Sequence, residues 1–435
     1  MKNFILVLIA ILGSLTARSQ TINIELSHFG GKGYKYVVAQ GAKFDTIAVG
    51  ALDKSGKAII LFKDGYKGFK GTSRFLLNDG GGFELVINKE NFTVRCSGDV
   101  PTAESLNFIG SPENEYLTSH SVKKQKLLQK AQIADAVLTA YNAADAVYAP
   151  FEKEQKQLNE QYKVLKNANS KNSLYAARLI EIFDFLMGNS SDLKDSNEKK
   201  MEEANTFVLS KVNMEDLYTS GYWADVWNSW LKLQLMQSKD DAKLLSNLEQ
   251  AGSVITNKTQ FTAFAERVIR QLAEVGKDNA VSSFGTYLSK SGKIENPGHN
   301  LLAAMGGPQT GMKAPDLIWK EGNYSFDKKQ KTLLVFYETG CNNCDNEINL
   351  LIGNYQELQK KGYEIVTAAS DVDPAEYQKN ADRFPWKKKF SDFRGQAGYN
   401  FISFGVIGTP TIFVIDENGI ITGRYAHLAD AHILN

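Results

Sequence analysis

Hydrophobic and polar positions follow three different patterns along the chain, and each pattern predicts a different kind of structure. In residues 21–97 apolar side chains alternate with polar ones, as at Ile22, Ile24 and Leu26, and turn-forming residues separate the alternating runs. A period of two is typical of strands that bury one face. We therefore predict a small antiparallel sheet or sandwich in residues 20–110.

From residue 111 to residue 305 the period lengthens to that of amphipathic helices. One apolar stripe covers residues 176–186 and is followed by Gly188, a residue type that often ends helices. Trp223, Trp227 and Trp230 recur at helical spacing. Tryptophans in this pattern usually belong to a core, although an aromatic binding groove is the alternative. We therefore predict a helical domain here, in which the charged residues 151–166 form a long surface helix or, less simply, a partner-binding coiled coil.

A stretch rich in glycine, at residues 306–311, is interpreted as a linker, and strands alternate with helices after it. Residues 332–337 form a nearly continuous apolar run, as expected of a buried central strand. Cys341 and Cys344 follow this strand, and apolar positions at helical spacing then continue to residue 358. With a second strand predicted at residues 363–369, residues 311–435 read as an α/β domain whose dicysteine lies at a strand-to-helix junction.

The first 19 residues have the features of a secretory signal peptide. Lys2 supplies a positive start, residues 4–12 are apolar, and small residues occur at the end of the segment. A retained membrane anchor is the alternative, but a spanning helix needs about 20 apolar residues. No cysteine precedes Cys96, which argues against lipid attachment at a processed cysteine. We expect a periplasmic or otherwise exported protein that is soluble after cleavage.

Composition and charge narrow the possible functions. A length of 435 residues suggests about two to four domains, and apolar and charged fractions of 43% and 23% are typical of soluble globular proteins. A net charge of +1 gives no argument for nucleic acid as a partner. Three cysteines are too few for a disulfide framework, so chemistry is the better reason for a close pair.

The position of Cys341 at the start of a predicted helix suggests a chemical role. The first backbone N–H groups of a helix lack partners and carry partial positive charge, which stabilises a thiolate. Cysteines in such settings have pKa values of about 3.5–7.5 instead of about 8.5. We therefore predict that Cys341 is the exposed attacking nucleophile and that Cys344, one helical turn further and more buried, resolves the mixed disulfide.

A zinc site and a structural disulfide are less satisfactory interpretations of the pair. A zinc site would need two further ligands, and Cys96 and five scattered histidines form no second paired motif. A structural disulfide across so short a loop would constrain the unfolded chain very little. We therefore favour redox chemistry without a metal or organic cofactor. Cys96 shares an apolar face with Phe92 and Val94, and we interpret it as a small buried hydrophobic residue.

The C-terminal motifs resemble the thioredoxin family, specifically its exported branch typified by TlpA and ResA. The matching segments are residues 314–317 (APDL), the Cys-x-x-Cys pair, residues 404–411 (FGVIGTPT) and the Ile-Asp-x-x-Gly turn at residues 415–419. The resemblance implies a thioredoxin-like fold in which Pro410 is cis and lies beside the dicysteine. It also implies that the backbone of Thr409 pairs with an extended substrate segment. The alternative is an ordinary proline before a strand.

One glutamate also matches the family pattern, whereas three other sites differ from it. Glu347 matches a glutamate that ResA-like members place near the active site, where it is thought to assist proton movement; it could instead serve only the helix dipole. Gly340 replaces the usual tryptophan, Asn342-Asn343 replaces Gly-Pro, and Val335 stands at the spacing of a buried acid. A difference of about 30 mV in the reduction potential of a dithiol pair corresponds to only about 1.4 kcal/mol. Because these three changes can shift the potential by such an amount, the sequence leaves open whether the pair oxidises or reduces its substrates.

The order of the three regions resembles exported proteins of the Bacteroidetes type, which place a β domain of unknown function and a helical middle before a TlpA-like domain. Our leading hypothesis is an exported thiol–disulfide oxidoreductase acting on protein thiols or disulfides, with a membrane or periplasmic redox partner. A peroxidase is a first alternative, but the Pro-x-x-x-Thr-x-x-Cys loop of peroxiredoxins is missing before Cys341. A non-catalytic binding module that retains the thioredoxin fold is the second, because residues 1–310 lie outside the redox domain. The sequence does not indicate an oligomeric state.

Overall fold

The structure is a computed structural model that describes residues 20–63, 65–102, 104–189, 195–238, 240–319, 322–326 and 329–434. The predicted signal peptide, residues 1–19, lies outside these described residues. The chain divides into two compact units, Met1–Glu181 with Thr219–Gly221, and Ile182–Tyr218 with Tyr222–Asn435. Within the described ranges, no helix combines the length and the apolar character needed to cross a membrane.

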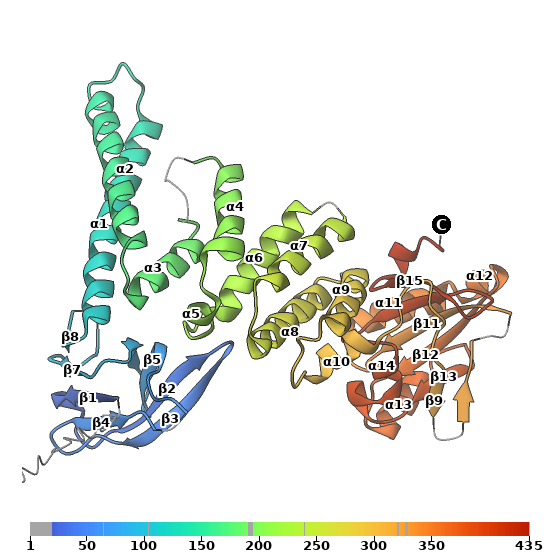
Figure 1. The fold of residues 1–435 in the computed structure, drawn as a ribbon. Helices are drawn as coiled ribbons and strands as arrows, with labels where there is room; N and C mark the ends of the chain where they lie inside the picture. The colour runs from blue at the N-terminus through green and yellow to red at the C-terminus, as the bar shows by residue number, and fades with distance from the viewer. Residues whose placement is uncertain are drawn as a thin grey trace, which may run out of the picture. The chain divides into compact units, whose positions relative to one another are not determined.

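Two four-stranded sheets form the N-terminal part of the first unit (Figure 1). Their strand orders are β4-β1-β7-β8 and β3-β2-β5-β6. Neighbouring strands are antiparallel except β1 and β7, which run parallel. The predicted antiparallel domain is thus confirmed, with one parallel pair that side-chain alternation cannot reveal because both pairings have a period of two. The bounds are β1 (Thr21–Leu26), β2 (Gly33–Gln40), β3 (Lys43–Ala51), β4 (Lys57–Leu61), β5 (Lys70–Leu77), β6 (Gly82–Asn88), β7 (Phe92–Cys96) and β8 (Leu106–Ile109), with a 3-10 turn η1 at Ser27–Phe29.

The alternating apolar side chains of these strands share one core. Ile22, Ile24 and Leu26 are fully buried in it, and so is Cys96. The Cys96 thiol is free, and its Sγ lies 3.5 Å from the hydroxyl oxygen of Ser105. This burial agrees with the predicted role of Cys96 as a small hydrophobic residue.

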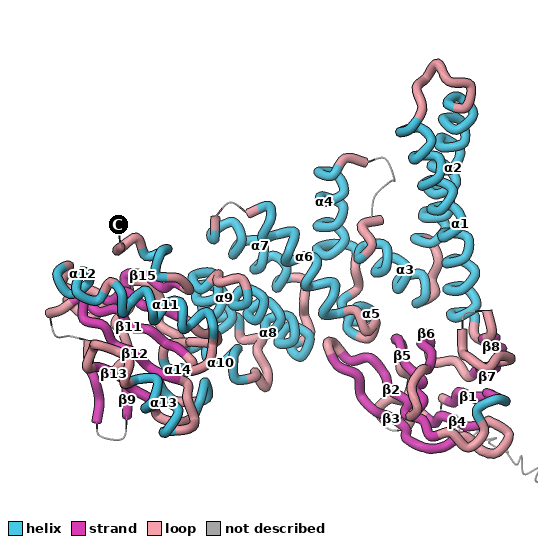
Figure 2. The backbone as a smooth tube through the Cα atoms, turned by 180° about the vertical axis from the view of Figure 1, so that it is seen from behind, coloured by secondary structure: helices cyan, strands magenta, loops and turns pink. Residues whose placement is uncertain are grey.

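A long helical hairpin follows, formed by α1 (Pro112–Ala140) and α2 (Tyr148–Ser170), which lie side by side (Figure 2). The side chain of Ser111 caps α1 by accepting the N–H of Asn114, and a proline occupies the first turn. The charged segment predicted as a surface helix lies within α2, where the sparse apolar residues Leu158 and Tyr162 are buried. The chain then enters α3 (Tyr175–Leu186).

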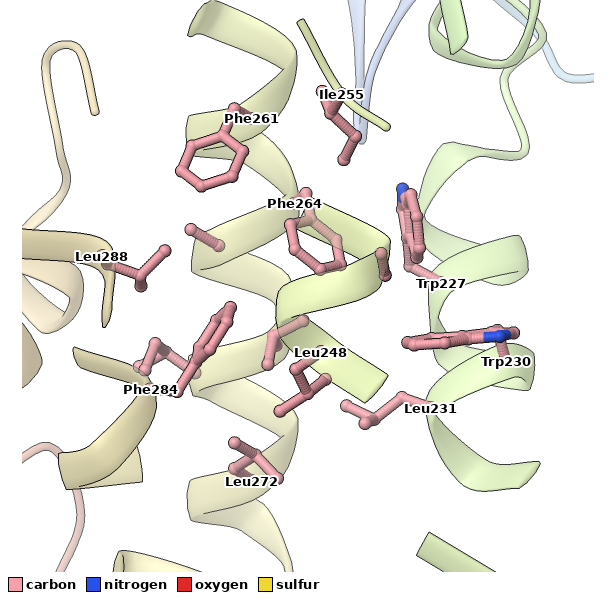
Figure 3. Packing of buried hydrophobic residues seen from close by; sticks show 14 of the residues in the cluster. Trp227, Trp230, Leu231, Leu248, Ile255, Phe261, Phe264, Leu272, Phe284 and Leu288 are labelled. Carbon is pink, nitrogen blue, oxygen red and sulfur yellow. The ribbon is translucent and has the colours of Figure 1, made fainter. Parts of the chain in front are cut away.

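The helices of the second unit enclose an aromatic core (Figure 3). Trp223, Trp227 and Trp230 are buried in it, and the rings of Trp227 and Phe264 lie 4.5 Å apart between centroids. The tryptophan stripe is therefore core, as the sequence favoured. The elements are α4 (Asn197–Thr206), the π-helical turn η2 (Phe207–Lys211), α5 (Met214–Tyr218), α6 (Trp223–Gln237), α7 (Asp241–Ser253), α8 (Lys258–Glu274), α9 (Asp278–Ser291) and α10 (His299–Gly306).

The C-terminal part of this unit is built on a five-stranded sheet of order β13-β12-β11-β14-β15. The central strand β11 is parallel to β12 and antiparallel to β14. Both strands predicted around the dicysteine are present, but the predicted helix breaks at Asn354, because glycine and asparagine at positions 353 and 354 favour helix poorly. The bounds are β9 (Leu317–Trp319), β10 (Gly322–Tyr324), β11 (Lys331–Tyr337), α11 (Asn342–Gly353), α12 (Tyr355–Lys360), β12 (Tyr363–Ala369), α13 (Pro374–Ala381), β13 (Lys388–Ser391), η3 (Gly395–Ala397), α14 (Tyr399–Ser403), β14 (Thr411–Ile415), β15 (Ile421–Tyr425) and η4 (Leu428–Ala431).

Buried clusters cover both faces of this sheet. Along β11, Leu334 and Phe336 pack with residues of α14, whereas Leu333 and Val335 pack with residues of α11, α12 and α13. Successive side chains of a strand point to opposite faces, which explains why the run is apolar throughout. The result is a three-layer α/β arrangement, as predicted for the C-terminal region.

The stretch interpreted as a linker is packed rather than free. A Cβ atom at Gly307 would lie 2.7 Å from the Cα atom of Gly405, so the two backbones meet without room for a side chain. The side chain of Gln309 donates to the carbonyl of Ser282 at 3.1 Å, and the N–H of Gly311 donates to the carbonyl of Ile421 at 2.8 Å. Glycine therefore serves here for close approach rather than for flexibility.

A buried ion pair also joins the helices to the sheet. The Arg424 guanidinium on β15 lies 3.8 Å from the carboxylate of Asp278, the first residue of α9, and both side chains are almost fully buried. Arg424 also donates to the carbonyl of Gly405 at 2.9 Å. Burial raises the pKa of the Asp278 carboxyl, and the Arg424 charge opposes that rise. Removing one partner would leave a buried charge unpaired, so the contact ties the two regions together.

The close approach of Gly307 and Gly405 can be tested with Gly307→Ala. The added methyl group must push the backbones apart, and overpacking of this kind costs about 1–3 kcal/mol in the free energy of unfolding. Urea unfolding followed by tryptophan fluorescence would measure the loss, because all five tryptophans belong to the second unit.

Gly306→Ala is the matched control, because a Cβ atom there meets nothing within 4 Å. It should leave stability unchanged or raise it by about 0.5–1 kcal/mol, since alanine favours helix over glycine. Equal stability of the two variants would contradict the packing described here.

Candidate active site

Strand pairing brings the cysteines next to the Pro410 loop. Strands β11 and β14 are antiparallel, with Phe336 opposite Thr411. The C-terminal end of β11 therefore lies beside the start of β14. The segment that follows β11 and the segment that precedes β14 consequently meet at the same edge of the sheet. Cys341 belongs to the first of these segments and Pro410 to the second.

Cys341 occupies the N-cap position of α11. Its Sγ accepts the backbone N–H of Cys344 at 3.4 Å and lies 3.9 Å from the carbonyl oxygen of Thr409, to which the thiol can donate. Both cysteines are free thiols. Cys341 is partly exposed, whereas only 1% of Cys344 is exposed. Cys341, the more exposed of the two cysteines, therefore lies at the positive end of the helix.

The loop before Cys341 is held by partly buried polar contacts. The carboxylate of Asp371, just after β12, accepts the N–H of Thr339 at 3.0 Å and its hydroxyl at 2.8 Å. The side-chain amide of Asn380 donates to the same hydroxyl at 3.1 Å. Gly340 then adopts a φ of +79°, in the left-handed region that favours glycine. This backbone geometry explains why the residue before Cys341 is a glycine and not the tryptophan usual in thioredoxins.

Burial separates the chemistry of the two thiols. Desolvation raises the pKa of Cys344 to about 12, and its contact with Cys341 acts in the same direction. A thiol with such a pKa remains protonated at neutral pH, and only a thiolate is nucleophilic. Cys344 is therefore unsuited to the first attack, which agrees with the predicted order of the two cysteines.

The loop on the other side of the site carries Thr409 and Pro410. The peptide bond between them is cis. The hydroxyl of Thr411 donates to the carbonyl of Gly408 at 2.8 Å and closes the loop. Ile407, at its start, is buried in the core cluster of the helices. The loop is thus supported from the sheet and from the helical part.

Glu347 is buried on α11 and binds a segment near the C-terminus. Its carboxylate accepts the backbone N–H of Leu428 at 2.9 Å and lies 3.0 Å from Nδ1 of His427. The His427 side chain is 59% exposed. A buried carboxylate on α11, the helix that follows Cys341, is thus connected to a solvent-accessible imidazole just after β15. Sequence reasoning missed His427, because an isolated histidine gives no motif.

A groove of about 730 Å³ lies beside Thr409 and Pro410. Its other lining residues include Val275 and Gly276, between α8 and α9. The sequence gives no signal for this wall, since it comes from helices far along the chain. Within the described part of the chain, no three His, Cys, Asp or Glu side chains are grouped so that they could hold a metal ion.

Comparisons with known proteins concern the C-terminal region. Residues 310–424 match the model of the AhpC/TSA family. A similar solved structure is a putative thiol:disulfide interchange protein DsbE from Chlorobium tepidum, at 25% identity over 29% of this chain and 92% of that one, with a TM-score of 0.25. Another is the thioredoxin domain of a thiol-disulfide oxidoreductase from Bacteroides vulgatus, at 23% identity over 27% and 89% of the two chains, with a TM-score of 0.25.

The comparison with curated proteins found no match to this chain. The family match covers the segment that contains the sheet, the dicysteine and the Pro410 loop. The C-terminal region of this chain is therefore a thioredoxin-like domain, of which residues 310–424 match the AhpC/TSA family model.

Proposed function

We propose that this protein is an exported thiol–disulfide oxidoreductase that exchanges disulfides with protein substrates through Cys341 and Cys344. The observation that carries the proposal is the position of Cys341, a partly exposed residue at the N-terminus of α11 whose sulfur contacts Cys344 and Thr409. Export is proposed only from the leader-like pattern of residues 1–19.

The reaction takes place in two exchanges. The Cys341 thiolate attacks one sulfur of a substrate disulfide, so that a mixed disulfide forms and the other substrate sulfur leaves and takes up a proton. Cys344 then loses its proton and attacks the Cys341 sulfur, which releases the second substrate thiol. The substrate gains two electrons and two protons, and the cysteine pair becomes a disulfide. A thiol-based redox partner in the membrane or periplasm would reduce the pair again.

Residues around the pair support these steps. Thr409 is partly exposed next to the Cys341 sulfur, so its backbone could pair with an extended segment that carries the substrate disulfide. Glu347, one turn beyond Cys344, could take the proton that Cys344 must lose and pass it to His427. Peroxide reduction is not favoured. Leu334 stands where a peroxiredoxin loop has proline, and it is buried inside strand β11.

The proposed activity predicts different outcomes for Cys341→Ser and Cys344→Ser. In an insulin-reduction assay with dithiothreitol, the first variant should lose activity, because serine cannot form the mixed disulfide. The second lacks the resolving thiol, so the reduced variant, mixed with insulin after dithiothreitol has been removed, should accumulate a mixed disulfide detectable by mass spectrometry. Wild-type activity in Cys341→Ser, or an inactive wild type, would instead favour the binding-module alternative.

Native alkylation should distinguish the two thiols. At pH 8, iodoacetamide should modify Cys341 and leave Cys344 unmodified, because Cys344 is buried and its pKa is about 12. Mass spectrometry of peptides would locate the label, and guanidinium-unfolded protein, in which all three cysteines react, is the control. Equal labelling of both residues in the folded protein would contradict the assigned roles.

Glu347→Gln tests proton transfer from Cys344. General acid–base groups contribute about 10²–10⁴-fold to rates, so we expect insulin reduction to fall about tenfold or more at neutral pH. The loss should shrink as the pH rises and hydroxide takes over the role of the base. Asp345→Asn is the control, because Asp345 lies in the first turn of the same helix, where its charge interacts favourably with the dipole. An equal, pH-independent loss in both variants would leave Glu347 with a structural role only.

A further inference from the structure

The groove beside the Pro410 loop has two walls that come from different regions of the chain. The thioredoxin-like domain supplies Asn343, Thr409 and Pro410 on one side. The helical part supplies Ala273 and Val275 among the lining residues, at the end of α8 and in the turn before α9. Val275 is 57% exposed, so the second wall presents an apolar side chain to the groove.

Backbone hydrogen bonds fix the turn that forms the second wall. The N–H of Gly276 donates to the carbonyl of Ala273 at 3.0 Å, and the N–H of Lys277 donates to the carbonyl of Leu272 at 2.9 Å. Gly276 has a φ of +70°. These are the two bonds and the left-handed residue of a Schellman motif, which satisfies the last carbonyls of a helix. The wall is therefore a defined turn.

The second wall is also fixed relative to the first. A Cβ atom on Gly276 would lie 3.4 Å from the Cβ atom of Ala426, so the turn contacts the segment just after β15. Asp278, two residues later, pairs with Arg424 on β15. Ile407, three residues before Pro410, is buried among the helices. Both walls therefore belong to one packed body, and the width of the groove is set by folding.

We propose that the turn between α8 and α9 is the second wall of a substrate groove that admits one extended, disulfide-bearing polypeptide segment. This inference rests on the proposed function. The volume of about 730 Å³ falls within the range of about 300–1,000 Å³ typical of ligand sites. A strand added along Thr409 occupies a width of about 4.8 Å in a sheet, whereas a folded domain is several times wider. The proposed substrates are therefore disulfides in unfolded or loop segments, because a single extended strand can pair with the backbone of Thr409.

A bulky side chain on the second wall tests the proposal in the full chain. Val275→Trp should lower kcat/KM for insulin about tenfold or more, because displacing a bound substrate by about 1 Å can cost about 10²-fold. Reduction of the small disulfide 5,5′-dithiobis(2-nitrobenzoate) should stay within about twofold of wild type, since it does not need the whole groove. Met236→Trp is the matched control, because Met236 is an exposed apolar residue of the helical part at 72% exposure and does not line the groove.

The outcomes separate the inference from the proposed function. If wild type reduces neither disulfide, the proposed function fails. If wild type is active, two results would overturn only the groove inference. The first is that Val275→Trp reduces insulin as well as wild type does. The second is that Val275→Trp loses activity on both disulfides in proportion while its circular dichroism is native.

A second measurement applies if Val275→Trp does not fold. In Cys344→Ser carrying a trapped insulin-chain mixed disulfide, a photoactivatable benzophenone amino acid at position 275 should crosslink to the trapped chain. The same amino acid at position 236 should not. Absence of the crosslink at position 275 would also overturn the inference.

Discussion

Burial of Ile407 among the helices is the contact on which the geometry of the candidate site depends. Ile407 begins the loop that carries Thr409 and Pro410, so the helical core fixes one side of the site. The close backbone approach of Gly307 and Gly405 and the buried pair of Arg424 with Asp278 act in the same direction. A packed interior does not deform continuously, so these contacts hold the loop in one position. The helical part is therefore a structural component of the site.

Unequal burial of two sulfurs, only three residues apart, divides the chemistry between them. Cys341 caps a helix and remains partly exposed, while Cys344 is enclosed by side chains of the sheet and of α11. Two buried carboxylates of this region accept hydrogen bonds: Asp371 from Thr339, and Glu347 from the N–H of Leu428. Buried carboxylates are tolerated when donors satisfy them, and here each donor belongs to a segment that the site needs in place.

Local pattern predicted much of the architecture. Periodicity predicted the apolar run of β11, the helix after the dicysteine and the tryptophan stripe of α6. It does so because an element that buries one face or both faces has a characteristic order of apolar and polar residues. Prediction was weaker where the order of apolar and polar residues fits more than one structure. The break at Asn354 and the parallel pairing of β1 with β7 have no distinct period. Residues 306–311 look like a linker in the sequence, but the structure packs the backbone of Gly307 against that of Gly405.

By itself, the sequence singled out the residues to which we assign the proposed chemistry: a dicysteine between a buried strand and a helix, and a Thr-Pro step before a later strand. Tertiary structure alone decided which of these residues meet. The Cys341 sulfur reaches Thr409 only because β11 pairs antiparallel with β14, and Glu347 reaches His427 only because the chain end returns to α11. The second wall of the groove comes from the turn after α8. The physical reason is that periodicity records whether a side chain is buried, but not which distant segment buries it.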